Sequence, residues 1–291
     1  MAVLLAAVCS AVVCLAGCAQ SVDPIERLGK KTAERVGTHR PAARPAYRRW
    51  GLSRPLAPAP AAARGRVGRV PGGAASGSVS GSVSGPGSGS GAGLPVVVDR
   101  VPTRDKVVFL TYDDGAERDP RFVDLVRELR LPVGMFLTDS VVGPGAGPGR
   151  AHFARLRAVG ATLENHTLDH PAMRGLSYAG QRAEICGQQR RLRARFGVRP
   201  RLFRPPYGAY DATTLRAAGD CGISAVVLWR VSVGGDGTLS YVAGERRLGP
   251  GDIIAVDPDE TTGPLLRERT VRLLREIQAG GLTVGRLEDY L

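Results

Sequence analysis

The stretch Lys106-Val-Val-Phe-Leu-Thr-Tyr-Asp-Asp-Gly115 decides the fold. Its first seven residues are mostly apolar and rich in β-branched and aromatic side chains, which is typical of a buried strand. Two carboxylates follow at once, and they repel each other unless a cation or another partner lies close by. Gly115 then permits a tight turn. A simple polar turn would explain the Asp113-Asp114-Gly115 triplet equally well, so the interpretation depends on the rest of the chain.

Strands and helices alternate on the C-terminal side of this stretch. Further strands are expected at 133–137, 161–164, 202–204, 223–229, 252–256 and 282–284, and helices at 119–129, 152–159, 178–196, 211–218 and 265–279. Such alternation favours parallel strand pairing. We therefore expect an α/β fold, a distorted (β/α) barrel with about seven parallel strands, whose reactive groups gather at the C-terminal ends of the strands.

Two more polar motifs follow expected strands. In His166-Thr-Leu-Asp-His170 the histidines are four residues apart, a spacing that on a helical turn would let both imidazoles reach one metal ion. A structural or surface pair of histidines is the alternative. In Arg204-Pro-Pro-Tyr-Gly208 the prolines fix the backbone and so present an arginine and a tyrosine rigidly. A proline-rich turn without function is the alternative here.

In their order and spacing the three motifs resemble those of the polysaccharide deacetylases, the NodB-homology domain or carbohydrate esterase family four, over residues 106–291. The resemblance implies metal-dependent removal of N-acetyl groups from a polysaccharide such as peptidoglycan or a chitin-like glycan. It implies a divalent cation, with Zn²⁺ favoured and Co²⁺ or Ni²⁺ compatible with the same ligands. The residues that match the family motifs are the metal ligands Asp114, His166 and His170, the catalytic residues Asp113, Arg204 and Tyr207, and the substrate-binding residues Trp229, Pro206 and Tyr207.

The roles implied for the catalytic residues are distinct. Asp113 is expected to be the general base, and Arg204 is expected to pair with it and hold its orientation. The backbone N–H of Tyr207 is expected to stabilise an oxyanion. Trp229 is expected to form the pocket wall beside the sugar.

Three positions depart from the family pattern. Asp257 stands where the family carries a histidine that protonates the leaving amine, and a carboxylate with its usual pKa of about 4 is a poor donor at neutral pH. Ser232 replaces an aspartate that supports the arginine, and the small Ala255 lines the acetyl pocket. These changes keep a second function open, a catalytically impaired glycan-binding lipoprotein of the same fold.

The N-terminus reads as an export signal. Residues 1–17 are apolar and end in Leu15-Ala-Gly-Cys18, which resembles a bacterial lipobox, although no Lys or Arg precedes the apolar run. We expect residues 1–18 to be a signal peptide and Cys18 to carry a lipid. The protein would then be extracytoplasmic, anchored through the lipid to the outer face of the cell membrane. A plain secretory signal is the alternative, and the protein would be secreted if Cys18 is not lipidated.

Residues 19–95 are expected to be a disordered, basic, Pro/Gly/Ser-rich tether before a deacetylase domain at 96–291. They hold 12 Lys and Arg against 3 Asp and Glu, so most of the formal net charge of +13 belongs to them. No nucleic-acid-binding motif accompanies this charge, so we expect no nucleic-acid partner. A wall- or membrane-associating adaptor, with the tether as its active part, is a third function.

Two cysteines, Cys186 and Cys221, fall in the expected domain. A disulfide between them and a pair of buried free thiols are both compatible with an exported protein. Sequence spacing does not decide between them, because bridging depends on the distance between the two backbones. We expect the protein to be a monomer.

Overall fold

A computed structural model describes residues 44–61, 94–114, 119–143, 145, 147–257 and 264–291. The expected signal peptide and Cys18 lie outside these ranges. Residues 45–291 belong to one compact unit, which is the subject of all that follows.

One mostly parallel sheet forms the centre of this unit. Its strands are β1 (Val96–Val98), β2 (Val107–Tyr112), β3 (Gly134–Leu137), β4 (Thr162–Asn165), β5 (Leu202–Phe203), β6 (Ala225–Val227), β7 (Val231–Val233), β8 (Leu239–Tyr241), β9 (Ile253–Val256) and β10 (Thr283–Val284). They lie in the order β1-β6-β5-β4-β3-β2-β9-β7-β8, and β10 pairs with β2. Every pairing is parallel except that of β7 with β8.

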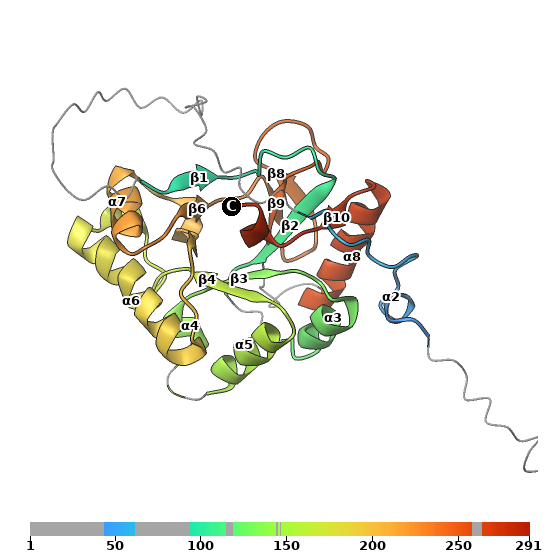
Figure 1. The fold of residues 1–291 in the computed structure, drawn as a ribbon, viewed down its shortest axis with the longest axis horizontal. Coiled ribbons are helices and arrows are strands. Elements are labelled where there is room, and N and C mark those ends of the chain that lie inside the picture. Colours follow the sequence, from blue (N-terminus) through green and yellow to red (C-terminus); the bar gives the residue numbers. More distant parts are fainter. Residues whose placement is uncertain (1–43, 62–93, 115–118, 144, 146, 258–263) are drawn as a thin grey trace, which may run out of the picture. The chain divides into compact units, whose positions relative to one another are not determined.

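Helices surround the strands in Figure 1. They are α2 (Ala46–Arg49), α3 (Phe122–Leu129), α4 (Asp139–Val142), α5 (Pro148–Ala158), α6 (Tyr178–Phe196), α7 (Ala212–Asp220) and α8 (Leu266–Ala279), with 3₁₀ turns η2 (Met173–Gly175), η3 (Pro206–Gly208) and η4 (Leu287–Asp289). The expected α/β fold with a curled, barrel-like sheet is confirmed. Within the described ranges, no helix is both long and apolar enough to cross a membrane.

Strand β2 shows how alternation sorts its side chains into two cores. Val108, Leu110 and Tyr112 pack in the core that also contains residues of the surrounding helices α3 and α8. Val107 and Phe109 pack in a second core with residues of β3, β5, β6 and β9, on the other face of the sheet. Successive strand residues point to opposite faces, so Thr111 continues the second, inner row toward the strand end. The residue after the strand, Asp113, follows Thr111 in that row.

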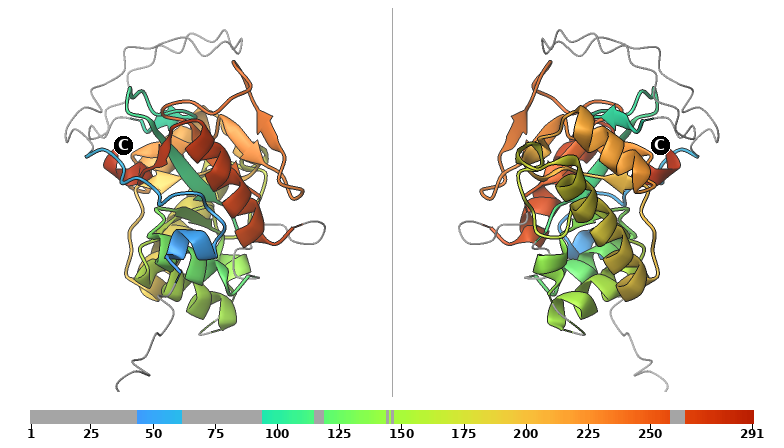
Figure 2. Two further views of the ribbon diagram at one scale, coloured as in Figure 1. Left: turned by 90° about the vertical axis from the view of Figure 1, so that its right-hand side faces the viewer. Right: turned by 90° about the vertical axis from the view of Figure 1, so that its left-hand side faces the viewer.

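The tether prediction is wrong for residues 45–61. This segment, named the strap here, lies on the domain, and Figure 2 shows α2 against α3. The carbonyl of Gly51, just after α2, accepts from Arg275 on α8 at 3.0 Å. Trp50 Nε1 donates to Glu128 at 2.8 Å, and Leu52 is only 3% exposed within the main core. The strap and Gln278 on α8 exchange two further hydrogen bonds of 2.6 and 2.9 Å. Its prolines remove N–H donors, yet its carbonyl groups and apolar side chains still find partners far away in sequence.

A disulfide joins α6 to the end of α7. Cys186 lies within α6 and Cys221 caps α7, and their Cα atoms are 5.0 Å apart. The distance falls in the range that a disulfide spans without backbone movement. The bridge therefore holds α6, the longest helix of the described part, against the chain that leads into β6.

Candidate metal and catalytic site

Three proposed metal ligands come together at the carboxyl ends of β2 and β4. Asp114 lies two residues after β2, and His166 follows β4 directly. Strand β3 pairs in parallel with both, so these ends share one edge of the sheet. The carboxylate oxygen of Asp114 and ring nitrogens of His166 and His170 lie within 4.8 Å of one another, and the two Nε2 atoms are 3.1 Å apart. One carboxylate and two imidazoles are the donor set of a hydrolytic zinc site with an open position, so these residues fit a divalent cation.

A hydrogen bond at Nδ1 orients the ring of His166 so that Nε2 can coordinate a metal ion. Nδ1 lies 2.7 Å from the carbonyl oxygen of Arg204, and a proton on Nδ1 would be donated to that oxygen. The lone pair of Nε2 is then directed away from this bond, toward the shared point. Burial of the ring lowers the pKa of His166 to about 4, so the imidazole is neutral at physiological pH. Burial also lowers the pKa of His170.

The loop that carries the histidines is not a helical turn, and this expectation is wrong. Thr167 and His170 both have positive φ angles, 76° and 58°, which a right-handed helix excludes. Thr167 Oγ1 accepts from the backbone N–H of His170 at 3.0 Å. Asn165 Oδ1 accepts from the N–H of Thr167 at 3.0 Å. Side-chain hydrogen bonds to the backbone, rather than helical hydrogen bonds, bring the second imidazole back toward the first.

Two residues that the sequence analysis missed support this cluster. The backbone N–H of Thr138, just after β3, donates to Asp114 Oδ1 at 2.6 Å, and its hydroxyl donates to the carbonyl of His166 at 3.0 Å. Glu184 on α6 accepts from the backbone N–H groups of Leu168 and Asp169, both at 3.0 Å. Thr138 could have been found in the sequence, because it is a polar residue that directly follows an expected strand. Glu184 gave none, because it lies in the middle of a polar helix.

Arg204 and Asp113 form an ion pair at the same edge. Arg204 is fully buried, and its guanidinium donates to Asp113 Oδ1 at 2.7 Å and to Thr111 Oγ1 at 2.8 Å. It also donates to the carbonyls of Val227 and Leu228 at 3.2 and 3.3 Å. The buried charge of Arg204 is therefore well supplied with acceptors, even though the aspartate expected from the resemblance is replaced by Ser232.

Aromatic rings flank this arginine. The guanidinium carbon lies 4.3 Å from the centre of the Phe136 ring and 5.4 Å from that of Trp229, which is half-buried. Gly208 has φ of 67°, and a Cβ atom there would lie 3.1 Å from the Trp229 ring. Glycine thus allows the turn after Pro206 to lie directly against the expected pocket wall.

Tyr207 lies beside the metal-ligand cluster. Its ring meets the His170 ring edge-on, with centroids 4.9 Å apart, while 70% of the residue is exposed. Its backbone has φ of 61°, whereas the adjoining Pro206 is buried. The left-handed conformation is uncommon for a tyrosine and is held by the flanking residues of the turn. Tyr207 therefore borders open space next to His170.

Asp257 follows β9, the neighbour of β2 on the other side. Val256 pairs with Tyr112, so the next residues along the two strands are Asp257 and Asp113. The backbone N–H of Asp257 donates to Val233 at 2.9 Å, and its carbonyl accepts from Arg269. The residue is exposed, and Ala255 before it is buried at 8% exposure. The strand register thus places Asp257 at the same edge as the other candidate residues.

Comparison with known proteins agrees with this arrangement. A family model described as polysaccharide deacetylase matches residues 100–226. An uncharacterised protein of Streptomyces coelicolor is 65% identical over 198 residues, which cover 68% of this chain and 78% of that protein. Residues 100–226 thus match the polysaccharide deacetylase domain.

Relatives with named activities are more distant. A chitooligosaccharide deacetylase of Sinorhizobium fredii is 29% identical over 62% of this chain and 87% of its own length. Chitin deacetylase 1 of Cryptococcus neoformans is 27% identical over 60% of this chain, which spans only 37% of that protein.

Solved structures share the fold. A family-four carbohydrate esterase pseudoenzyme of Bacillus anthracis superposes with a TM-score of 0.56 at 20% identity, covering 67% of this chain and 69% of its own. A mutant of that pseudoenzyme, described as having restored enzymatic activity, superposes with the same TM-score at 22% identity, covering 67% and 71%.

Proposed function

We propose that this protein is a metal-dependent N-deacetylase that removes acetyl groups from an N-acetylated polysaccharide of the cell envelope. The observation that carries the proposal is the convergence of Asp114, His166 and His170 within 4.8 Å, beside the 2.7 Å Arg204–Asp113 pair. A divalent cation held by these ligands would supply Lewis-acid polarisation of a carbonyl and lower the pKa of water.

The chain's own residues then have separate tasks. Asp113, oriented by a buried guanidinium, is placed to accept a proton from water. Tyr207, exposed beside His170, would face the sugar and offer its backbone N–H to the developing oxyanion. Trp229 would form the wall behind the acetyl group. Asp257 is the residue in position to return a proton to the leaving amine.

The test is acetate release from peptidoglycan fragments and chitin oligomers by the full chain, with Zn²⁺ or Co²⁺ added. Asp113→Asn is the control, because it keeps the shape of the side chain and removes the base. Release at least about a hundredfold above that of the control is expected, in line with the usual contribution of a general base. Equal release by both proteins would reject the proposal.

A second candidate function is glycan binding with little or no turnover. What favours it is Asp257, which directly follows Val256 at the end of β9, where the resemblance leads us to expect an acid histidine. The fold is shared with a protein described as a pseudoenzyme, whose mutant is described as having restored activity. Oligomer binding by the parent chain without acetate release, together with release by Asp257→His, would support this candidate over the first.

We also propose that Cys18 carries the lipid and holds the protein at the outer face of the membrane. The support is the position of the lipobox-like tripeptide at the end of the apolar run. Replacement of Cys18 by serine should move the protein from the membrane fraction to the culture medium. Retention of the variant in the membrane fraction would count against lipidation.

A further inference from the structure

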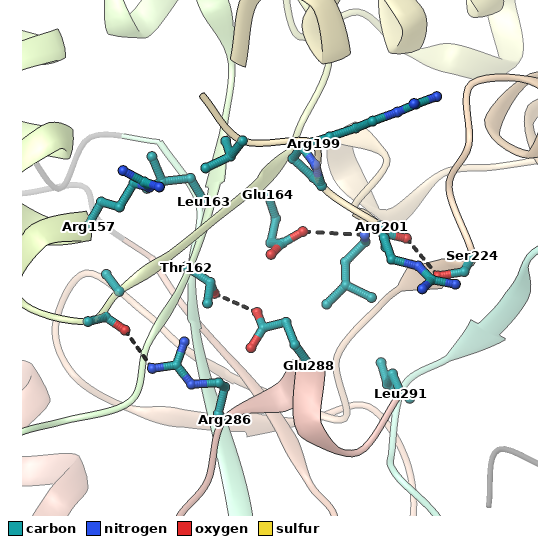
Figure 3. A pocket seen from close by; sticks show the side chains of 15 residues that line it. Arg157, Thr162, Leu163, Glu164, Arg199, Arg201, Ser224, Arg286, Glu288 and Leu291 are labelled. Atoms are coloured by element: carbon teal, nitrogen blue, oxygen red, sulfur yellow. Dashed lines mark hydrogen bonds between the residues drawn. The ribbon is translucent and has the colours of Figure 1, made fainter. Parts of the chain in front are cut away.

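A cavity opens at the opposite end of the sheet from the metal-ligand cluster. Figure 3 shows this cavity, whose volume is about 660 Å³. Its wall includes Thr162 at the start of β4, Leu202 at the start of β5 and Ser224 just before β6. These strands are parallel, so their amino ends form the edge opposite to the one that carries His166. The volume lies in the range of small-molecule sites, about 300–1,000 Å³.

Four arginines from three segments line this cavity: Arg157, Arg199, Arg201 and Arg286. Arg286 is half-buried and donates to the carbonyl of Gly160 at 3.0 Å, and the other three are exposed at the rim. In the part of the chain that the structure describes, none of the four forms an ion pair with a carboxylate. Arginines elsewhere, such as Arg204 and Arg230, do have such partners.

The interior of the cavity holds two carboxyl groups. Glu164, only 5% exposed, and Glu288 point into it from opposite walls in Figure 3. Burial and the neighbouring Glu288 raise the pKa of Glu164 well above its ordinary value, which favours its neutral form. Thr162 donates its hydroxyl to Glu288 at 2.5 Å. Four guanidinium groups thus outnumber the two carboxyl groups of Glu164 and Glu288, and the cavity attracts anions overall.

We propose that this cavity binds an anionic carbohydrate, a polyhydroxylated unit that bears a carboxylate or a phosphate. Guanidinium groups at the rim match the paired oxygens of either anion in fork geometry. Glu288 and the Ser224 hydroxyl can accept hydrogen bonds from sugar hydroxyls, and the half-buried Val198 and Leu291 offer apolar surface to a ring face. An anion without hydroxyl groups would contact only the arginines. A polyhydroxylated anion would also form hydrogen bonds with the polar interior and should therefore bind more tightly. The site is separate from the proposed deacetylation and does not require it.

Binding to the full chain is measured by isothermal titration calorimetry with four probes. They are N-acetylmuramic acid, which carries a carboxylate, glucosamine 6-phosphate, which carries a phosphate, neutral N-acetylglucosamine, and inorganic phosphate. At least one anionic sugar should bind with a Kd below about 1 mM, and more tightly than the neutral sugar. The stronger of the two anionic sugars identifies the anion. Equal binding of inorganic phosphate would mean an adventitious ion only, and no binding of either anionic sugar would overturn the proposal.

Paired variants locate the binding. The double variant Arg157→Gln/Arg201→Gln should weaken binding of the anionic sugar by about tenfold or more, since each substitution removes a charge-assisted hydrogen bond. Arg155→Gln with Arg246→Gln removes the same charge from exposed positions outside the cavity and should change the affinity by less than about twofold. Equal losses in both pairs would refute a site here.

A variant at the opposite edge separates this inference from the proposed function. Asp113→Asn should abolish acetate release and leave binding at the cavity unchanged. Loss of anionic-sugar binding in Asp113→Asn would instead assign the sugar to the metal site and overturn the inference.

Discussion

Glu184 provides the sharpest test of how the metal site is held. Its carboxylate accepts from the backbone N–H groups of Leu168 and Asp169, the residues between the two histidines, at 3.0 Å each. Helix α6 packs closely under this loop, since a Cβ atom at Gly187 would lie 2.4 Å from the Leu168 side chain. Glu184→Ala removes the acceptor from both N–H groups and leaves the ligands untouched. We therefore expect a loss of metal affinity without a change of ligand.

The size of the loss follows from the two hydrogen bonds. A buried hydrogen bond to a charged group contributes about 1.5–3 kcal/mol. Leu168 is half-buried and Asp169 is exposed, so we take about 1 kcal/mol for each, or about 2 kcal/mol for the ordered loop. The apparent zinc affinity falls in proportion to the fraction of molecules in which the histidine loop is ordered. A free-energy change of about 1.4 kcal/mol corresponds to a tenfold change in this affinity. Zinc binding should weaken by about tenfold, with about thirtyfold as the upper limit.

The assay is a zinc competition titration against a chromophoric chelator, with thermal unfolding measured on the same samples. Glu184→Gln keeps one acceptor oxygen and should recover most of the affinity. Glu268→Ala removes an exposed carboxylate from α8 and serves as the matched control. Zinc affinity of Glu184→Ala within about twofold of that of the parent would refute the reasoning. It would mean that losing the acceptor of these two N–H groups does not change the positions of the histidine ligands. An equal loss in Glu184→Gln would also refute the reasoning.

Three further predictions concern stability. The pKa of Glu164 is higher in the folded protein than in the unfolded chain. As pH rises above about 4.5, the unfolded chain loses this proton while the folded protein still holds it, so the free energy of unfolding falls. Glu164→Gln should therefore raise the Tm at pH 7 and flatten its dependence on pH, whereas Glu268→Gln should do neither. Replacing Cys186 and Cys221 by serine should lower the free energy of unfolding in urea by about 4 kcal/mol, the loop entropy for a separation of 35 residues. Leu52→Ala should cost about 2 kcal/mol in the same assay if the strap is part of the cooperative unit.

The sequence predicts the sheet well because most of its strands are short apolar runs bounded by polar motifs. The expected helix at 178–196 coincides with α6, and the one at 265–279 differs from α8 by a single residue. The expected strand at 223–229 is too long: β6 ends at Val227, and β7 begins only at Val231. Apolar periodicity cannot show at which residue the backbone stops pairing with the neighbouring strand, because Leu228 and Trp229 are as apolar as the residues of the strand.

The features that the sequence analysis missed depend on contacts between distant segments. The strap looks disordered because it is rich in proline and alanine, yet Arg54 meets Gln278 across 224 residues. The histidine loop was given helical geometry from spacing alone, whereas Thr167 and Asn165 fold it through side-chain hydrogen bonds. A spacing of four residues allows both arrangements, and only the φ angles distinguish them. Local composition cannot reveal partners that the fold supplies.

Asp257 and the proposed metal-ligand cluster lie at the ends of different strands, and this makes Asp257→His an informative variant. The backbone of Asp257 is already held by Val233 and Arg269, through bonds that do not involve the side chain. Ala255 before it is paired in the ladder with Thr111. A histidine at 257 would therefore occupy an existing strand end rather than require a new backbone path. A gain of acetate release in this variant would show that proton delivery alone limited the parent, because nothing on the β2 and β4 side has changed.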